Sequence, residues 1–365
     1  MMPKNMSTTK KKTTNHKSHS FPAALGYRMP AEWEKHEATW LAWPHNPETW
    51  TDLREIESIY IEIISLLVRG EKVNLLVNNL PEEERISAVL SKNKINLSQI
   101  RFFKIKTCDA WIRDYGPNFI VKKNVPKGGQ LAVNRWIFNA WGGKYEEHKE
   151  DDKASREITH SLGVTVFEPG IVLEGGSIDS NGKGTILTTE ECLLNPNRNS
   201  HLGKKEIEDY LKRYLAVQQI IWLKEGIEGD DTDGHIDDIA RFVNANTVVA
   251  AVEGNRADPN YELLQENLKC LKKEKDQDGK KLSVIPLPMP ERVSFSRERA
   301  PASYANFYIA NAAVLVPIFG HPNDKAALKI LKEFFPDRSV IGIRSTALVV
   351  GLGGIHCLTH EQPAV

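Results

Sequence analysis

The sequence predicts an α/β fold built from repeated strand–strand–helix–strand units. Helical stripes of apolar residues are centred near residues 155, 210, 267 and 329, and a short apolar run typical of a strand follows each one. Two more strand-like runs lie between successive helices, so a unit recurs about every 55–60 residues, a spacing that repeat and propeller architectures use. An earlier helix starts the first unit, which gives about five units, and closing them into a ring would bring their loops to one central cavity.

The first third of the chain supplies that earlier unit. Apolar positions from Leu53 to Arg69 follow a helical period and stop at Gly70. A buried strand is expected at 73–77, and a short helix opens at Pro81, where proline and the acids behind it suit a helix N-terminus. Further strands are expected at 101–105, 118–121 and 131–138. Three tryptophans upstream, Trp33, Trp40 and Trp43, are expected in the core.

The later units repeat the pattern. Strands are predicted after the four helices at 164–167, 220–223, 282–286 and 340–343. A turn at Asn181-Gly182-Lys183-Gly184 is typical of a hairpin between two strands.

Composition restricts the class of protein. The 365 residues are 41% hydrophobic, and 48 basic residues balance 48 acidic ones. That balance argues against general binding to nucleic acid or a membrane surface, and no apolar run reaches the length of a membrane span. Four separated cysteines without a C-x-x-C pair indicate a reducing, cytoplasmic compartment rather than a disulfide framework.

The first 20 residues are polar and basic, with almost nothing apolar to bury. We expect a disordered tail there, without the apolar segment of a signal peptide. Residues 21–365 are expected to form a single catalytic domain that begins near Phe21.

A candidate nucleophile lies close to the end of the chain. Cys357 follows the glycines of Gly351-Leu352-Gly353-Gly354, which permit a close approach of backbone or ligand. The pattern favours a last strand tucked into the core. Cys108 has no such glycine turn, and Cys192 and Cys270 lie in apolar patterns typical of packing residues.

His235 and Asp237 are a candidate acid–base pair. At spacing i, i+2 on a strand, both side chains point to the same face, and a neighbouring carboxylate raises the pKa of an imidazole. The spacing alone fits equally well a solvated acidic turn with a surface histidine.

Two other polar loops could meet in the cavity. Asp114 follows Trp111 by three residues, and a carboxylate beside an aromatic wall can hold a flat cation. Glu174 precedes Gly175-Gly176. Each signal, seen alone, fits a turn residue satisfied by local backbone.

A zinc site formed by His235, His356, Cys357 and His360 is an alternative to these roles. Neighbouring side chains on a strand point to opposite faces, so His356 and Cys357 would ligate one ion poorly. We therefore expect no metal and no cofactor, and the glycine run opens no helix as a dinucleotide fingerprint would.

Together these residues resemble the agmatine deiminase / bacterial-type peptidyl-arginine deiminase family of guanidine-modifying enzymes, from about Tyr27 to the C-terminus. The motifs that carry the resemblance are Met29-Pro30-Ala31-Glu32-Trp33-Glu34 with Trp40-Leu41-Ala42-Trp43-Pro44, Trp111-Ile112-Arg113-Asp114-Tyr115-Gly116-Pro117, Leu173-Glu174-Gly175-Gly176-Ser177, Thr232-Asp233-Gly234-His235-Ile236-Asp237 and Gly353-Gly354-Ile355-His356-Cys357-Leu358-Thr359. The chain departs from the family pattern at Gly354, where Asn is frequent, and at His360-Glu361, where Gln-Gln is frequent.

The resemblance implies a five-bladed α/β-propeller that hydrolyses a guanidinium group without a cofactor. It implies that Cys357 is the nucleophile and His235 the general acid and base, and that Asp114 and Asp237 bind the guanidinium. Glu174 falls on the family's active-site glutamate and Trp111 on the aromatic residue that flanks the substrate.

The expected reaction converts agmatine to N-carbamoylputrescine and ammonia through a covalent thiouronium on Cys357, a step of putrescine and polyamine biosynthesis. Agmatine ends in an amine, which Asp231 in the run Asp230-Asp231-Thr232-Asp233 could bind, although that run could equally be a solvated turn. The alternatives are a deiminase for arginine or peptidyl-arginine, an amidinotransferase, a metal-dependent ureohydrolase that would release urea, and a propeller that binds guanidines without turnover. The expected partner is a small guanidinium molecule, with a homo-oligomer left open.

Overall fold

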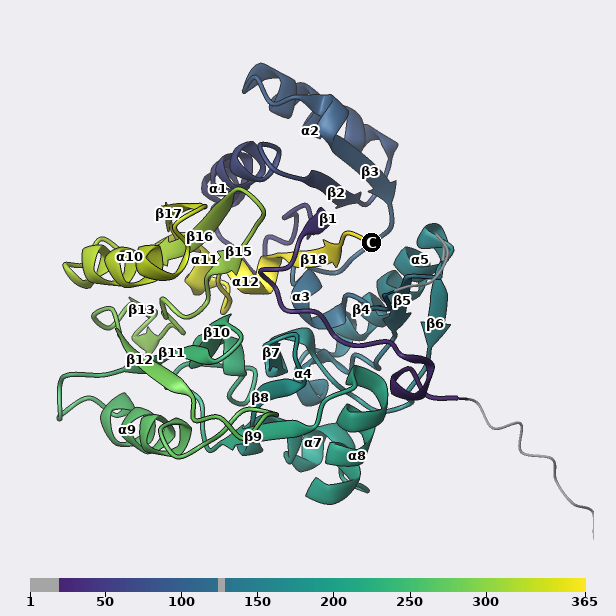
Figure 1. Ribbon diagram of the computed structural model, residues 1–365. Coiled ribbons are helices and arrows are strands. Elements are labelled where there is room, and N and C mark those ends of the chain that lie inside the picture. Colours follow the sequence, from purple (N-terminus) through teal and green to yellow (C-terminus); the bar gives the residue numbers. More distant parts are fainter. Residues whose placement is uncertain (1–19, 124–128) are drawn as a thin grey trace, which may run out of the picture.

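Five open sheets are arranged around a common centre, with the helices toward the rim (Figure 1). The structure is a computed structural model and describes residues 20–123 and 129–365. The predicted disordered tail, apart from residue 20, lies outside the described residues. Within the described part of the chain, no helix has the length and apolar character needed to cross a membrane.

The strands of each sheet follow one another along the sequence, with one exception. The sheets contain β18 (His360–Pro363), β1 (His36–Ala42), β2 (Lys72–Val77) and β3 (Ile100–Lys104); β4 (Asn118–Val121), β5 (Leu131–Asn134) and β6 (Thr165–Phe167); β7 (Asp179–Ser180), β8 (Thr185–Thr189) and β9 (Gln219–Leu223); β10 (Ala240–Asn244), β11 (Thr247–Val252) and β12 (Ser283–Pro288); and β15 (Tyr308–Ile309), β16 (Ala313–Ile318) and β17 (Ser339–Arg344).

The same pairing recurs in every sheet. An antiparallel strand pair is followed by a crossover helix and a parallel strand, as in β4–β5–β6 and β10–β11–β12. In the first sheet the antiparallel partner of β1 is β18, the last strand of the chain. The C-terminus therefore completes the first unit, which closes the series of five and confirms the repeated unit expected from the sequence.

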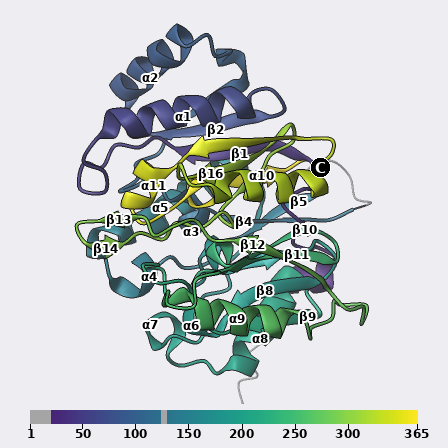
Figure 2. The ribbon, with the colours of Figure 1, turned by 90° about the vertical axis from the view of Figure 1, so that its left-hand side faces the viewer.

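A long helix crosses over in each unit. These helices are α1 (Leu53–Leu67), α5 (Asp151–Leu162), α8 (Lys204–Leu215), α9 (Asn260–Leu271) and α10 (Asn323–Phe334), and α2 (Leu80–Lys92) precedes the extra strand β3. In the view turned by 90°, α9 and α10 again lie on the outside of their units (Figure 2). The helices and strands predicted for the repeated units are confirmed, with bounds that differ by a few residues. The largest difference is at β5, which ends at Asn134 rather than at residue 138.

Local chemistry accounts for where these helices begin and end. Asp52 caps α1 by accepting from the backbone N–H groups of Arg54 and Glu55, and Asn79 caps α2 in the same way. Gly163 ends α5 in the left-handed region, at φ 61°. The apolar stripe of α1 is buried, as are Trp40 and Trp43.

Short helical turns carry the chain across the centre. They are α3 (Ile112–Tyr115), η4 (Gly175–Ser177), η5 (Ile236–Asp238) and α12 (Ile355–Leu358). Contacts join α12 to α3, α3 to η4 and η4 to η5. The candidate motifs lie on or beside these turns, which therefore bring the motifs of four units together.

The remaining elements are short connections. They are η1 (Ala23–Leu25), η2 (Leu97–Gln99), α4 (Ala140–Gly143), η3 (Glu146–Glu150), α6 (Glu190–Leu193), α7 (Pro196–Asn199), the hairpin of β13 (Ser294–Phe295) and β14 (Glu298–Arg299), and α11 (Thr346–Val350).

Two predictions of local structure were wrong. Cys357 lies on the helical turn α12 instead of a last strand, and the strand begins at His360. His235 and Asp237 lie at the start of and within the 3₁₀ turn η5, not on a strand. The cause in the second case is Asp230, whose side chain accepts from the N–H groups of Gly234 and His235 and folds the segment back on itself.

Candidate active site

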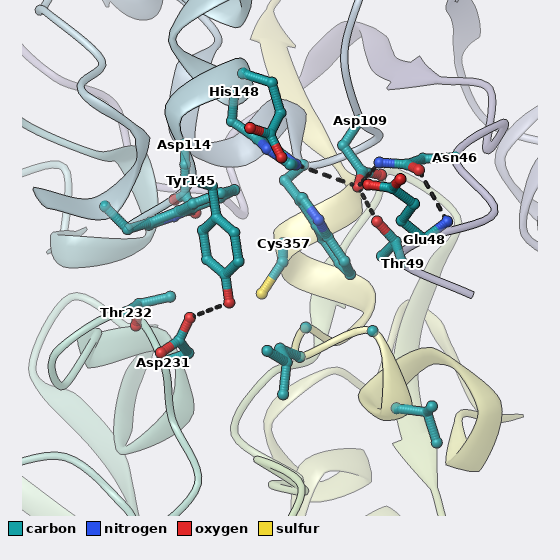
Figure 3. Close-up of a pocket in the computed structure, with 17 residues that line it drawn as sticks. Asn46, Glu48, Thr49, Asp109, Asp114, Tyr145, His148, Asp231, Thr232 and Cys357 are labelled. Carbon is teal, nitrogen blue, oxygen red and sulfur yellow. Dashed lines mark hydrogen bonds and ion pairs between the residues drawn. The ribbon is translucent and has the colours of Figure 1, made fainter. Parts of the chain in front are cut away.

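A cavity of about 340 Å³ opens where the central turns meet. Cys357 points into it, and Asp114, Tyr145 and Asp231 surround it (Figure 3). Trp111 and Trp141 also line it. None of the described residues that line the cavity is a lysine or an arginine.

The Cys357 thiol is buried among carboxylates. Its Sγ lies 3.9 Å from Oδ2 of Asp237 and 3.3 Å from Nδ2 of Asn306. Burial raises the pKa of this thiol well above its usual value, and the charges of Asp237, Asp238 and Asp114 raise it further. The free protein therefore holds Cys357 as a thiol, and a cation entering the site would favour the thiolate.

The glycines before Cys357 are required by what packs on them. A Cβ at Gly351 would lie 2.2 Å from Nε1 of Trp50, and one at Gly353 would lie 2.3 Å from Cζ3 of Trp111. At Gly354, Oδ1 of Asn306 would be 2.3 Å away. The run thus lets two indoles and one amide approach the backbone next to the thiol.

Asp114 is held by two donors. Its Oδ1 accepts from the backbone N–H of Gly176 and its Oδ2 from Nε1 of Trp141, both at 2.9 Å. Burial raises the pKa of Asp114, and this exceeds the lowering by His235 and Trp141. The sequence analysis missed Trp141; the signal that could have found it is its position before Gly142-Gly143, which resembles that of Glu174 before its glycine pair.

The backbone around Trp141 is strained. Ala140 and Trp141 have φ values of 57° and 51°, in the left-handed region. Such a conformation costs roughly 1–2 kcal/mol for each non-glycine residue, and it occurs mainly where a site needs it. Here it directs the indole N–H at Asp114.

His235 lies beside Asp114, with Nδ1 3.7 Å from Oδ1. Burial by itself lowers the pKa of His235, but Asp114, Cys192 and Asp237 together raise it well above its usual value. The imidazole is therefore positively charged at neutral pH. A Cβ at Gly176 would lie 2.5 Å from its Nδ1, so this glycine makes room for the ring.

Glu174 is buried behind His235. Its Oε1 forms an ion pair of 2.6 Å with Nε of Arg198, while its Oε2 has no partner within the described residues. Arg198 also pairs with Asp233 at 2.6 Å, so the sequence segment that bears His235 is tied to the segment that bears Glu174.

Asp237 presents one free oxygen. Its Oδ2 lies 2.7 Å from Nδ1 of His356, and its buried Oδ1 has no partner in the described part of the chain. An unpaired buried carboxylate oxygen costs free energy unless a donor fills the place. A substrate N–H group could be that donor.

The outer part of the cavity is acidic. Tyr145 donates to Oδ2 of Asp231 at 2.5 Å (Figure 3). Lys144, which does not line the cavity, lies 3.6 Å from Oδ1 of Asp231 and pairs more closely with Asp233, at 2.8 Å. Glu48, Asp109 and Glu147 are further acidic residues of the lining.

One group of side chains could hold a metal ion. Ligand atoms of Glu174, Cys192 and His235 lie within 4.8 Å of one another, and this is the one such group found in the described residues. Its glutamate is already paired with Arg198. The zinc set weighed from sequence is dispersed, since His356 binds two carboxylates and His360 binds the carbonyl of Pro117.

The structure thus brings together the residues predicted from the sequence. Trp111, Asp114 and Cys357 line the cavity with Asp231, while Glu174, His235 and Asp237 lie directly behind them. Sequence reasoning missed Trp141, Asn306 and Tyr145. Cys192 is buried, as predicted for a packing residue, and it also contacts His235.

A ring of five such units with a buried thiol and paired carboxylates at its centre defines the class of α/β-propellers that modify guanidines. The Porphyromonas-type peptidyl-arginine deiminase model matches residues 28–363. The chain belongs to this family, which confirms the resemblance seen in the sequence.

Named relatives, from sequence and from structure, agree. An agmatine deiminase from Ectopseudomonas mendocina is 36% identical over 367 aligned residues, which cover 94% of this chain and 97% of the relative. A structure of the Enterococcus faecalis agmatine deiminase catalysing its reaction superposes with a TM-score of 0.86 at 32% identity and covers 95% of this chain and 98% of that one. The C. jejuni agmatine deiminase with substrate bound gives 0.82 at 33% identity, covering 93% and 96%.

Proposed function

We propose that the protein is an agmatine deiminase, a hydrolase that converts agmatine and water to N-carbamoylputrescine and ammonia. The observation that carries the proposal is the charge of the cavity: two carboxylates, Asp114 and Asp237, lie beside the buried thiol of Cys357. The relatives named agmatine deiminase support the same choice.

The proposed binding step pairs the guanidinium with Asp114 and Asp237. A guanidinium presents its N–H groups in one plane, so two carboxylates can hold it by charge-assisted hydrogen bonds and fix its orientation. Trp111, in the cavity wall, would flank its flat face. The free Oδ1 of Asp237 offers an acceptor for one of these N–H groups.

Binding would also activate the nucleophile. The substrate cation neutralises Asp114 and Asp237, two of the carboxylates that raise the pKa of Cys357, so the thiol releases its proton to solvent and becomes a thiolate when the substrate is in place. The sulfur then attacks the guanidinium carbon, and a C–S bond forms.

His235 would supply and later recover a proton. As an imidazolium it protonates the departing nitrogen, the C–N bond breaks, and ammonia leaves a thiouronium on Cys357. The neutral imidazole then takes a proton from water, the hydroxyl adds to the same carbon, and the C–S bond breaks to give the ureido product. Glu174 would orient the ring during both steps.

The group at the end of the substrate opposite the guanidinium distinguishes agmatine from arginine. Arginine carries a carboxylate that needs a cationic partner, whereas agmatine ends in an amine. Asp231, Glu48 and Glu147 on the cavity lining favour the amine. Arginine or peptidyl-arginine is the second candidate, since the family model is named after peptidyl-arginine deiminases.

The test is a panel of substrates. Ammonia release is measured with agmatine, arginine and an arginyl peptide at equal concentrations. We expect agmatine to give the largest kcat/KM; a preference for arginine or the peptide would replace agmatine as the substrate, and urea as the product would overturn deimination. The four free cysteines support a reducing, cytoplasmic setting for the reaction.

A further inference from the structure

A buried histidine next to the nucleophile links the active site to a charged network beneath it. The ring of His356 contacts a carboxylate on each side: Nδ1 lies 2.7 Å from Oδ2 of Asp237, and Nε2 lies 2.7 Å from Oε2 of Glu32. All three side chains are buried. His356 takes no part in the reaction steps proposed for Cys357 and His235.

Glu32 is anchored by donors from other elements. Its Oε2 accepts from Nη2 of Arg241 at 2.8 Å, with Nη2 of Arg113 3.6 Å away, and its Oε1 accepts from the backbone N–H of Ile309 at 2.7 Å. Glu32 is therefore fixed in place, and its contact with Nε2 restrains the His356 ring.

The other nitrogen faces the carboxylate that would grip the substrate. A carboxylate oxygen accepts a hydrogen bond, so Nδ1 of His356 must be the donor to Asp237. Burial and the guanidinium groups of Arg113 and Arg241 lower the pKa of His356, which favours a neutral ring with a single N–H. The contact with Asp237 requires that hydrogen on Nδ1.

We infer that His356 is a positioning residue: it fixes Oδ2 of Asp237, the oxygen that lies 3.9 Å from Sγ of Cys357, and so leaves Oδ1 free to accept from the guanidinium. This inference rests on the proposed function, because it takes a guanidinium as the substrate. It accounts for the asymmetry of Asp237, which has one oxygen anchored at 2.7 Å and one buried oxygen without a partner among the described residues. It also explains why Glu32, far away in the sequence, is buried beneath the site.

The main chain of His356 is fixed as well. Its N–H donates to Oδ1 of Asn306 at 2.9 Å, and its carbonyl accepts from Nε of Arg113 at 3.2 Å. The charged groups that act on the ring come from several elements: Glu32 before β1, Arg113 in α3, Asp237 in η5 and Arg241 in β10.

Two amide substitutions separate the two contacts. In His356→Asn the side-chain N–H₂ falls near the place of Nδ1 and can still donate to Asp237, whereas in His356→Gln it falls near Nε2 and can donate only to Glu32. Loss of a hydrogen bond to a charged group changes an equilibrium by about 10- to 100-fold. We expect His356→Gln to raise the KM for agmatine by that factor, and His356→Asn to raise it only a few-fold.

The matched control is His360→Gln. His360 is also buried in the C-terminal segment, but its Nε2 binds the carbonyl of Pro117 and no carboxylate of the site. The KM of the His360→Gln variant for agmatine is expected to stay close to that of the wild type. A Gln variant at position 356 that binds agmatine better than the Asn variant, or equal KM values in all folded variants, overturns the inference.

A second measurement does not depend on turnover or on the folding of variants. The ¹⁵N resonances of the His356 ring, assigned in histidine-labelled enzyme at neutral pH, are expected to show hydrogen on Nδ1. A bare Nδ1 overturns the inference, because it could not donate to Asp237. If the enzyme releases no ammonia from any guanidine, the proposed function fails, while the ring resonances still decide the role of His356 toward Asp237.

Discussion

The indole of Trp141 donates a hydrogen bond of 2.9 Å to Oδ2 of Asp114. The two residues lie on different turns of the second unit, and a strained backbone at Trp141 is what directs the donor. Because the acceptor is fully buried, the bond restricts the carboxylate to one orientation. That orientation leaves Asp114 facing the cavity beside His235.

Removing this donor should weaken substrate binding more than chemistry. Trp141→Phe keeps most of the ring but leaves Asp114 with one donor fewer, so its pKa rises further. We expect the KM for agmatine to rise about tenfold, the effect of one hydrogen bond to a charged group, and to do so most at low pH. The KM at each pH is obtained from steady-state ammonia release between about pH 6 and 9, a range that begins near the usual pKa of histidine.

The matched control for that substitution is Trp136→Phe. Trp136 is also buried, but its Nε1 has no partner among the described residues. Its KM should not change. An equal KM in the two variants would show that the hydrogen bond to Asp114 is not what matters.

The sequence was informative where function requires particular residues close together along the chain. The motifs around Asp114, Glu174, His235 and Cys357 each lie within a few residues, and all meet at the centre. The five-unit pattern was also readable, because apolar periodicity marks helices and strands that pack against a core.

Partners from distant parts of the chain could not be predicted in the same way. Asn306 contacts Cys357 and Trp141 contacts Asp114, and although the glycine pair after Trp141 marks a loop of interest, the local sequence does not say which residue either one contacts. The strand expected at His235 was wrong for a related reason: Asp230 caps the turn through its side chain, and such a bond overrides a spacing argument.

Replacing the nucleophile should abolish turnover while leaving the binding carboxylates intact. For Cys357→Ser we expect kcat to fall by more than about 10³-fold, since a hydroxyl has a far higher pKa than a thiol and is not activated at neutral pH. Agmatine binding, measured by calorimetry, should persist. Cys270→Ser is the control, because Cys270 lies in α9 away from the cavity; wild-type turnover by Cys357→Ser would refute the assignment.

A methyl group added at Gly353 should disturb the aromatic wall. The new Cβ would meet Cζ3 of Trp111 at 2.3 Å, and a ring held in a packed core cannot give way cheaply. We expect Gly353→Ala to lose about 1–3 kcal/mol of unfolding free energy and to raise KM. Gly254→Ala meets nothing within 4 Å and serves as the control in denaturant titrations.

The positive charge on His235 predicts how stability and activity change with pH. Burial by itself lowers the pKa of His235, but Asp114, Cys192 and Asp237 together hold it above its usual value in the folded protein. The resulting stabilisation is fully present below the unfolded pKa of about 6.5 and is lost as pH rises through the folded value. Activity should decline over the same alkaline range, because His235 loses the proton that the leaving ammonia needs.

Asp114→Asn should lower the pKa of His235, which is followed by NMR of the ring protons. An unchanged pKa would mean that Asp114 does not contribute to raising the pKa of His235.

Selectivity for the amine end of agmatine should depend on Asp231. Its Oδ2 is oriented by Tyr145 at 2.5 Å, and Asp231→Asn keeps the shape of the side chain while removing its charge. A partly exposed charge contact contributes about 1 kcal/mol, so we expect the KM for agmatine to rise roughly fivefold. The KM for arginine should rise less or fall, since its carboxylate no longer meets Asp231.

Glu48→Gln and Glu147→Gln are the controls, because they distinguish a specific contact from a general negative potential. A change in the ratio of agmatine to arginine turnover that is confined to Asp231→Asn assigns the amine to Asp231. If all three variants change that ratio equally, Asp231 makes no particular contact with the amine.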